Sequence, residues 1–149
     1  MATTDHDADA QRRHETLFRR LLEDGFGSGD LTAVDEAVAP ECTEHQPGIE
    51  PGIEGLKGTI RFLRTAFPDL TMRIEDLVVA GDKVWGRMRA RGTHLGPFLG
   101  RPATGLTMAI DIIDICRFAN GKIVEHRGVP DRFTLAQQPG FLPGAPTDG

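Results

Sequence analysis

Hydrophobic positions in the N-terminal part of the chain recur at the spacing of amphipathic helices. From residue 9 to residue 24, apolar side chains return every three or four positions, which predicts one helix with a buried stripe that includes Leu22. Asp30 is a suitable N-cap for a short second helix. A third helix is predicted over residues 53–67, with Phe67 on its inward side.

Beyond the third helix the period changes to two, as expected for strands with one buried face. In one of these strands, Val84, Gly86, Met88 and Ala90 alternate with Trp85, Arg87, Arg89 and Arg91. The predicted strands span residues 70–79, 83–94, 106–118 and 123–130, and a shorter strand and loop is predicted over residues 41–50. The dipeptide Asn120-Gly121 predicts a tight hairpin between the last two strands.

This order of elements is typical of an α+β domain, with three N-terminal helices packed on one face of a strongly curved antiparallel sheet. We expect a cavity between the concave face of such a sheet and the helices. The 149 residues fit one domain. We predict a disordered N-terminal segment at residues 1–8, a small-molecule-pocket domain at residues 9–140 and a flexible tail at residues 141–149.

The hairpin turn also predicts which side chains of the last two strands face the interior. If Asn120 and Gly121 form the loop, Asp114 lies opposite Arg127, and residues directly opposite share a face. The more apolar face, which we assign to the interior, carries Met108, Ile110, Ile112, Asp114, Cys116, Phe118, Ile123, Arg127 and Val129. The other face, which includes His126 and Gly128, is assigned to the surface, and a bulge would change this register.

Charge and cysteine content narrow the range of partners. The formal net charge is −5, which argues against a surface for nucleic acid or anionic membranes. The sequence has neither an apolar run long enough for a membrane span nor a signal-peptide pattern, so we expect a cytoplasmic protein. Cys42 and Cys116 lack metal-ligand spacing and are interpreted as buried thiols. Glu44 and His45 would point to opposite sides of a strand, so no metal site is predicted.

Three ionisable residues are candidates for catalysis. Asp114 interrupts an apolar strand on the predicted inner face, where a charge is costly unless it is paired or used, and a salt bridge to Arg127 is the alternative. His94 ends a strand near the expected cavity mouth, or it only bonds the backbone of the adjacent loop. Asp131 could contact a ligand or cap the terminal turn. The expected substrate-binding residues are Met88, Ile110, Ile112, Arg127, Leu22 and Phe67.

Two stretches resemble the SnoaL-like polyketide cyclases of the nuclear transport factor 2 superfamily. They read GTHLGPFLGRPATG at residues 92–105 and GKIVEHRGVPD at residues 121–131, and the likeness covers roughly residues 10–140. The resemblance implies a conical α+β barrel with a deep pocket, no metal and an oligomeric state. In the aldol-type cyclases it also implies an acid/base aspartate two residues after the histidine of the His-Arg pair, and a histidine on the neighbouring strand. Here those positions hold Gly128 and Asp114, which points toward hydroxylase-like or otherwise diverged members.

We therefore expect a cofactor-independent enzyme of polyketide-type secondary metabolism. It would act as a cyclase or be hydroxylase-like, using acid/base chemistry on a hydrophobic ketone substrate and forming a homodimer or higher homo-oligomer. Such substrates have acidic C–H bonds beside carbonyls, so one carboxylate or imidazole can begin the reaction. Two alternatives stay open: a non-catalytic small-molecule-binding or association domain on the same fold, and a ketosteroid-isomerase-like proton transfer.

Overall fold

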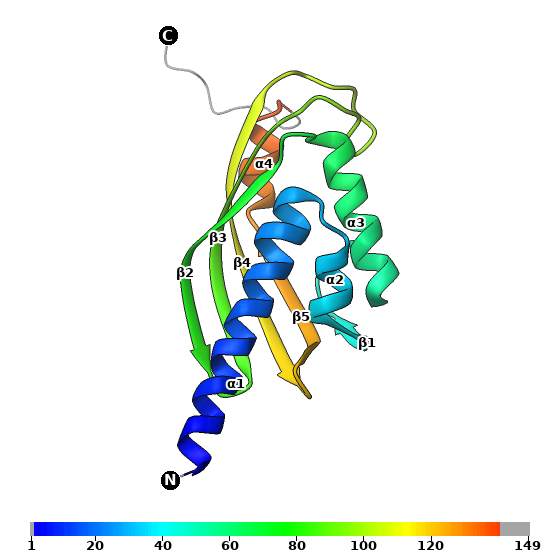
Figure 1. The fold of residues 1–149 in the computed structure, drawn as a ribbon. Helices are drawn as coiled ribbons and strands as arrows, with labels where there is room; N and C mark the ends of the chain where they lie inside the picture. Colours follow the sequence, from blue (N-terminus) through cyan, green and yellow to red (C-terminus); the bar gives the residue numbers. More distant parts are fainter. Residues whose placement is uncertain (1, 141–149) are drawn as a thin grey trace.

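Helices α1, α2 and α3 lie on one side of a curved five-stranded sheet (Figure 1). The computed structural model describes residues 2–140, and it has the α+β architecture that the sequence predicts. In chain order the elements are α1 (Ala2–Arg19), the π-helical segment η1 (Arg20–Phe26), α2 (Thr32–Ala37), β1 (Val38–Glu44), α3 (Gly52–Ala66), β2 (Thr71–Ala80), β3 (Lys83–Thr93), β4 (Thr107–Ala119), β5 (Lys122–Pro130) and α4 (Arg132–Gln137).

The first helix is longer than predicted at both ends. It begins at Ala2, so the segment expected to be disordered is helical from its second residue, with Asp5 favourably placed in the first turn. The helical path continues as η1 to Phe26 and ends with Gly27 as the C-cap. The flexible tail predicted for residues 141–149 lies outside the described residues. Within residues 2–140, no helix has the length and apolar character needed to cross a bilayer.

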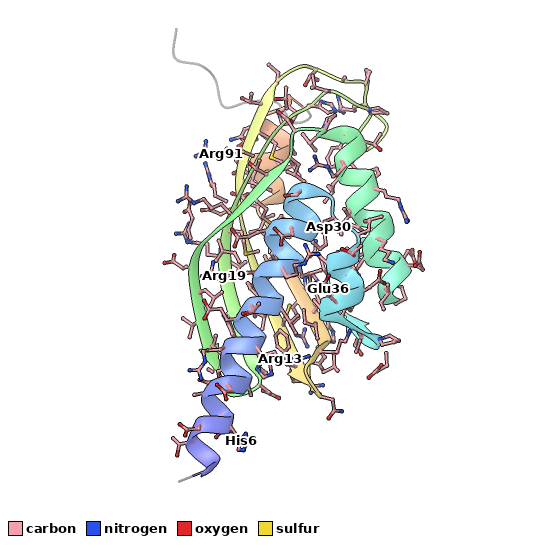
Figure 2. All side chains as sticks on the ribbon, in the orientation of Figure 1. His6, Arg13, Arg19, Asp30, Glu36 and Arg91 are labelled. Atoms are coloured by element: carbon pink, nitrogen blue, oxygen red, sulfur yellow. The ribbon has the colours of Figure 1, made fainter. Side chains whose placement is uncertain are left out.

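Polar contacts at the surface link the start of η1 to α2 and to the segment before it. The Arg20 guanidinium donates to Glu36 at 2.9 Å and to Asp30 at 2.8 Å. Figure 2 shows the Asp30 and Glu36 side chains at this junction. Asp30 lies one residue before the N-cap of α2, which is Leu31 and not Asp30 as predicted, and its carboxylate accepts from the main-chain N–H of Thr32 at 3.0 Å.

The sheet has the strand order β1-β5-β4-β3-β2. Strands β2 to β5 form antiparallel neighbours, whereas β1 pairs with β5 in parallel. This parallel pair was not predicted, because β1 and β5 are far apart in the sequence. It aligns Glu44 at the end of β1 with His126 on β5, and these two residues are central to the site described below.

The β4–β5 hairpin contains a one-residue bulge. The two pairs next to the turn follow the predicted register, but the next pair skips Val124 and places Arg117 opposite Glu125. On the outer face, Arg117 Nη2 lies 3.3 Å from Glu125 Oε1. The bulge thus places Arg117 and Glu125 together on the outer face of the sheet. The two pairs next to the turn keep the register that the turn sets.

Beyond the bulge, the inward and outward positions of β5 are exchanged relative to the prediction. Asp114 pairs with Gly128 rather than with Arg127. Arg127 and Val129, which we had placed inside, are exposed, and His126, which we had placed outside, is buried. These three assignments, and that of the buried Gly128 to the surface, were wrong for one physical reason: because side chains alternate along a strand, one extra residue inverts every later position.

The core lies between the concave face of the sheet and the helices. On β3, the side chains predicted to face inward are buried, including Val84 and Met88. Gly86 lies under the ring of Phe18 from α1, and a Cβ at this position would come within 2.5 Å of that ring. Because Gly86 has no side chain, α1 can pack close to β3 at this point, and the Phe18 ring fills the space above the glycine.

Candidate functional site

A cavity of about 850 Å³ lies between the concave sheet face and the segments η1 and α3. Most of its wall is apolar, as is typical of sites for small organic molecules. Four predicted substrate-binding residues, Leu22, Phe67, Ile110 and Ile112, line it.

The other two predicted substrate-binding residues do not line the cavity. Met88 faces the helices but is enclosed in the core, with no exposed surface. Arg127 lies on the exposed face of β5 because of the bulge. The salt bridge between Asp114 and Arg127, which was the alternative to a catalytic role of Asp114, is therefore excluded by the alternation of the strand.

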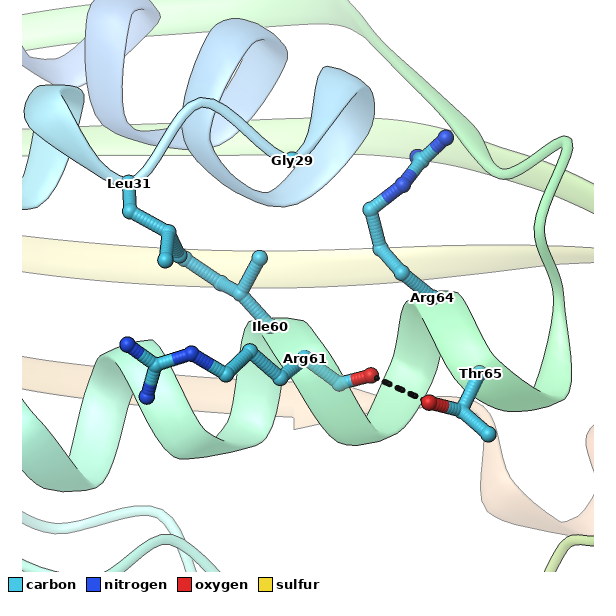
Figure 3. Close-up of a pocket in the computed structure, with 6 residues that line it drawn as sticks. All are labelled: Gly29, Leu31, Ile60, Arg61, Arg64 and Thr65. Atoms are coloured by element: carbon cyan, nitrogen blue, oxygen red, sulfur yellow. Dashed lines mark hydrogen bonds between the residues drawn. The ribbon is translucent and has the colours of Figure 1, made fainter.

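A second, smaller hollow of about 370 Å³ lies between α3 and the segment that follows η1 (Figure 3). Its wall includes Leu31, Ile60 and Arg64. The Arg64 guanidinium donates to the main-chain oxygens of Gly27 and Leu70 at 3.1 and 2.9 Å. Arg64 thus ties α3 to the end of η1 and to the start of β2, which is a structural role.

Three charged residues form a buried chain at the large cavity. The His126 ring lies between two carboxylates: its Nδ1 is 2.8 Å from Glu44 Oε1, and its Nε2 is 2.8 Å from Asp114 Oδ2. The three side chains are only 1 to 5% exposed. Asp114 comes from β4, His126 from β5 and Glu44 from β1, so three adjacent strands supply one residue each.

The two carboxylates determine the charge state of the histidine. Burial by itself lowers the pKa of His126, but Asp114 and Glu44 outweigh it and raise the pKa from 6.5 to about 10. At neutral pH the ring is therefore an imidazolium that donates one N–H to each carboxylate. The hydrogen bond from the ring to Oδ2 fixes the orientation of the Asp114 side chain.

The two oxygens of Asp114 have different surroundings. Oδ2 accepts from His126, whereas Oδ1 is buried and has no hydrogen-bond partner within the described part of the chain. A buried carboxylate oxygen without a partner is costly, and such groups often mark functional sites. Asp114 is also one of the residues that line the cavity.

His94 and Asp131 lie apart from the cavity wall. His94 Nδ1 is 2.9 Å from the hydroxyl of Thr104 and accepts from the Thr104 main-chain N–H at 3.3 Å, so the ring holds the β3–β4 loop. Asp131 accepts from the N–H and hydroxyl of Thr134 at 3.0 and 2.7 Å and caps α4. These contacts correspond to the alternatives offered in the sequence analysis: bonding to the adjacent loop for His94 and capping of the terminal turn for Asp131.

Two residues of the buried chain were missed by the sequence reasoning. His126 was assigned to the surface because the bulge is not visible in the turn sequence. A signal was nevertheless present, since Glu125 and Arg127 flank His126, and two charged residues facing water would direct the residue between them inward. Glu44 was considered only as a metal-ligand type. Within residues 2–140, no group of three His, Cys, Asp or Glu side chains is arranged to hold a metal ion.

Both cysteines are buried free thiols, as predicted. Burial raises the pKa of the Cys42 thiol to about 11, and burial also raises the pKa of the Cys116 thiol well above its usual value. Neither side chain lines the cavity. Both thiols thus stay protonated at neutral pH and act as apolar core groups.

Comparison with known proteins agrees with this architecture. The sequence pattern of the SnoaL-like polyketide cyclases matches residues 16–139, and the chain belongs to this family. The aklanonic acid methyl ester cyclase DnrD of Streptomyces peucetius is 29% identical over 131 residues, which cover 83% of this chain and 88% of that protein. The nogalonic acid methyl ester cyclase of Streptomyces nogalater is 26% identical over 113 residues, covering 71% of this chain and 82% of that protein.

Solved structures show the same fold. TsrD from Streptomyces laurentii has a TM-score of 0.81 and is 34% identical, with 88% of this chain and 97% of that chain covered. IdmH from Streptomyces antibioticus has a TM-score of 0.75 and is 33% identical, with 84% and 96% covered. The relatives that act as cyclases support a polyketide cyclase-type role for this family member.

Proposed function

We propose that this chain is a polyketide cyclase that closes a ring of a hydrophobic ketone by acid/base chemistry at Asp114. The observation that carries the proposal is the unpartnered Oδ1 of Asp114, buried at the wall of an apolar cavity. The cavity volume of about 850 Å³ is in the range of sites that enclose organic molecules of several rings. The named substrates of the relatives, methyl esters of aklanonic and nogalonic acid, indicate the class to test.

The proposed reaction is an intramolecular aldol addition. Asp114 Oδ1 takes a proton from the carbon beside a carbonyl, and the electron pair of that C–H bond passes into an enolate. The enolate carbon then forms a C–C bond to a second carbonyl carbon of the same molecule, whose π electrons move onto its oxygen. The resulting alkoxide takes the proton back from Asp114. These steps are balanced without a redox cofactor or a metal ion.

We infer that Asp114 takes the place of the aspartate that the family pattern has at position 128. The resemblance implies an acid/base aspartate at position 128, where this chain has glycine. Residue 128 is the direct cross-strand partner of Asp114. A Cβ at position 128 would lie 2.8 Å from Asp114 Oδ1, so β4 supplies a carboxylate to the space that a side chain from β5 would enter. Gly128 is therefore compatible with a cyclase.

The test is conversion of aklanonic acid methyl ester by the wild type and by Asp114→Asn, followed by chromatography and mass spectrometry. We expect Asp114→Asn to lower the rate by about 100- to 10,000-fold, since it removes the general base. The control is Asp111→Asn, an exposed position on the same strand.

Two results would contradict the proposal. One is an Asp114→Asn variant that converts the ester as fast as the wild type. The other is a wild-type protein that binds the ester tightly but does not convert it or the nogalonic ester, which would favour the non-catalytic binding domain.

We also propose that the chain forms a homodimer through the outer face of its sheet. Trp85 and Val78 are cross-strand partners on this face, as are Ile113 and Val129, and each is about half exposed or more. Several apolar side chains on one exposed face favour association. Light scattering after size-exclusion chromatography should give twice the chain mass, and Trp85→Glu should give the monomer. A monomeric wild type at high concentration would refute this proposal.

A further inference from the structure

Gln46 reaches over the strand that faces Asp114. It follows β1 by two residues, and the parallel pairing of Glu44 with His126 brings it alongside Gly128 on β5. Gln46 is one of the cavity-lining residues and is partly exposed. The cavity therefore has a carboxamide at the same place as its unpartnered carboxylate oxygen.

Gly128 provides the space that this carboxamide occupies. A Cβ at position 128 would lie 1.8 Å from Gln46 Oε1 and 2.9 Å from the carboxamide carbon. The same point is 2.8 Å from Asp114 Oδ1, so the two side chains meet above the glycine. Since real Cβ atoms do not approach other atoms so closely, any other residue at 128 would displace the Gln46 carboxamide.

The buried chain also positions Gln46. Glu44 Oε1 accepts from the Gln46 main-chain N–H at 2.8 Å and from His126 Nδ1 at 2.8 Å. The hydrogen bond uses the main chain of Gln46, which leaves the carboxamide for other partners. One carboxylate thus fixes both the histidine that holds Asp114 and the main chain from which the Gln46 side chain extends.

We propose that the Gln46 carboxamide, turned about its terminal bond so that its NH2 group takes the place of Oε1 above Gly128, donates a hydrogen bond to the substrate oxygen that becomes the enolate oxygen when Asp114 removes the adjacent proton. The inference rests on the proposed function. An enolate needs a hydrogen-bond donor beside the base that forms it. A lysine or arginine at this place would pair with Asp114 and occupy its Oδ1, whereas an uncharged N–H donor can serve the substrate oxygen and leave the carboxylate available. Gly128 is thus a specificity-determining position because it makes room for this donor.

The test separates oxyanion binding from proton removal. The probe is a monohydroxyanthraquinone, whose visible absorbance reports the ionised phenolate, a stable mimic of an enolate. In the Asp114→Asn background, binding of the phenolate should be stronger than in the wild type because a like charge is gone. Adding Gln46→Ala to that background should weaken binding about 10- to 100-fold, the value of a hydrogen bond to a charged group. Gln11→Ala on α1, outside the cavity wall, is the matched control and should change nothing.

Gly128→Ala tests the role of the glycine. Its methyl group should displace the carboxamide and weaken phenolate binding as much as Gln46→Ala does. In the Gln46→Ala background, Gly128→Ala should then add little. A penalty that persists in that background would show that Gly128 does not act through Gln46, and would overturn this part of the inference.

The outcomes distinguish the two proposals. If Gln46→Ala leaves phenolate binding unchanged while Asp114→Asn abolishes ester conversion, the role of Gln46 is wrong and the proposed function stands. If Asp114→Asn leaves ester conversion unchanged, or if the Asp114→Asn protein does not bind the phenolate at all, both fail.

Discussion

Two clusters of charged side chains lie on opposite faces of the same sheet, and their distances are nearly equal. On the inner face, His126 lies 2.8 Å from each of Asp114 and Glu44. On the outer face, Arg87 lies 2.7 Å from Asp76 and 2.9 Å from Glu75. The inner side chains are 1 to 5% exposed and the outer ones 37 to 70%. Contact distance alone therefore does not show which cluster contributes more to the stability of the fold.

The difference lies in what happens when a partner is removed. A charge left alone on the outer face is solvated by water and screened by salt, so exposed pairs contribute little. A charge left alone on the inner face has neither solvent nor a replacement partner, and its burial is costly. Removing any one residue of the inner cluster should therefore destabilise the protein more than removing a residue of the outer cluster. The following predictions test this difference.

The largest effect is expected for His126→Leu. This change leaves the buried carboxylates of Asp114 and Glu44 facing each other without the positive ring, and should lower the free energy of unfolding by about 3–5 kcal/mol. Denaturant titration at neutral pH measures it. Neutralising both carboxylates in the same variant, with Asp114→Asn and Glu44→Gln, should recover part of the loss. A loss below about 1 kcal/mol would be typical of an exposed pair and would contradict the contrast.

A pH dependence of stability is the second prediction. The pKa of His126 is about 10 in the folded protein and 6.5 for a free histidine side chain, so the folded state holds the proton more tightly. This stabilisation is complete below pH 6.5 and is lost as the pH rises toward 10. The wild type should therefore lose more stability than His126→Leu between these limits. Taking the difference between the two proteins removes the parallel contribution of the buried cysteine thiols, and equal slopes would refute the prediction.

Moving the carboxylate from position 114 on β4 to position 128 on β5 should alter the cyclase activity. Gly128→Asp alone would displace Gln46 and place a second carboxylate beside Asp114, and should lower the rate of ester cyclisation by about 100-fold. Adding Asp114→His recreates the arrangement that the resemblance implies for aldol-type cyclases, and should restore most of that loss. Turnover of aklanonic acid methyl ester measures both. A double variant as inactive as the single one would show that the acid/base carboxylate cannot be moved from β4 to β5.

The smallest effect is expected for Arg87→Ala on the outer face. Hydrogen bonds that Arg87 donates to Asp76 and Glu75 raise the pKa of Arg87, but all three side chains are substantially exposed. The melting temperature should change by less than about 2 °C, and even less in high salt. Calorimetry at low and high salt measures this. A loss as large as that of His126→Leu would show that burial does not separate the two clusters.

The sequence was sufficient for the fold class and for Asp114, but not for the neighbours of Asp114. The period-two pattern of β3 and β4 depends only on local alternation, and Met108, Ile110 and Asp114 face inward as predicted. His126 could not be placed because a bulge at Val124 inverts the strand, and hairpin turns do not encode bulges farther along.

The other omissions are long-range contacts. Glu44 meets His126 through a parallel strand pair that joins distant parts of the chain, and no periodic pattern announces such pairing. The contact of Gln46 with the space above Gly128 depends on that pairing in turn. Gly128 looked like a lost catalytic residue in the sequence, whereas in the fold it is the place where two side chains meet.

The unpaired Val124 has a consequence for how this protein could diverge. Removing that one residue would restore a regular strand without changing its pairing, because Glu125, His126 and Gly128 would stay opposite Arg117, Cys116 and Asp114. Losing this residue would thus leave unchanged the groups that β5 presents to the cavity. In a library of single deletions along β5, the deletion at 124 should be tolerated better than a deletion at 127, which would move every later residue of the strand to the other face.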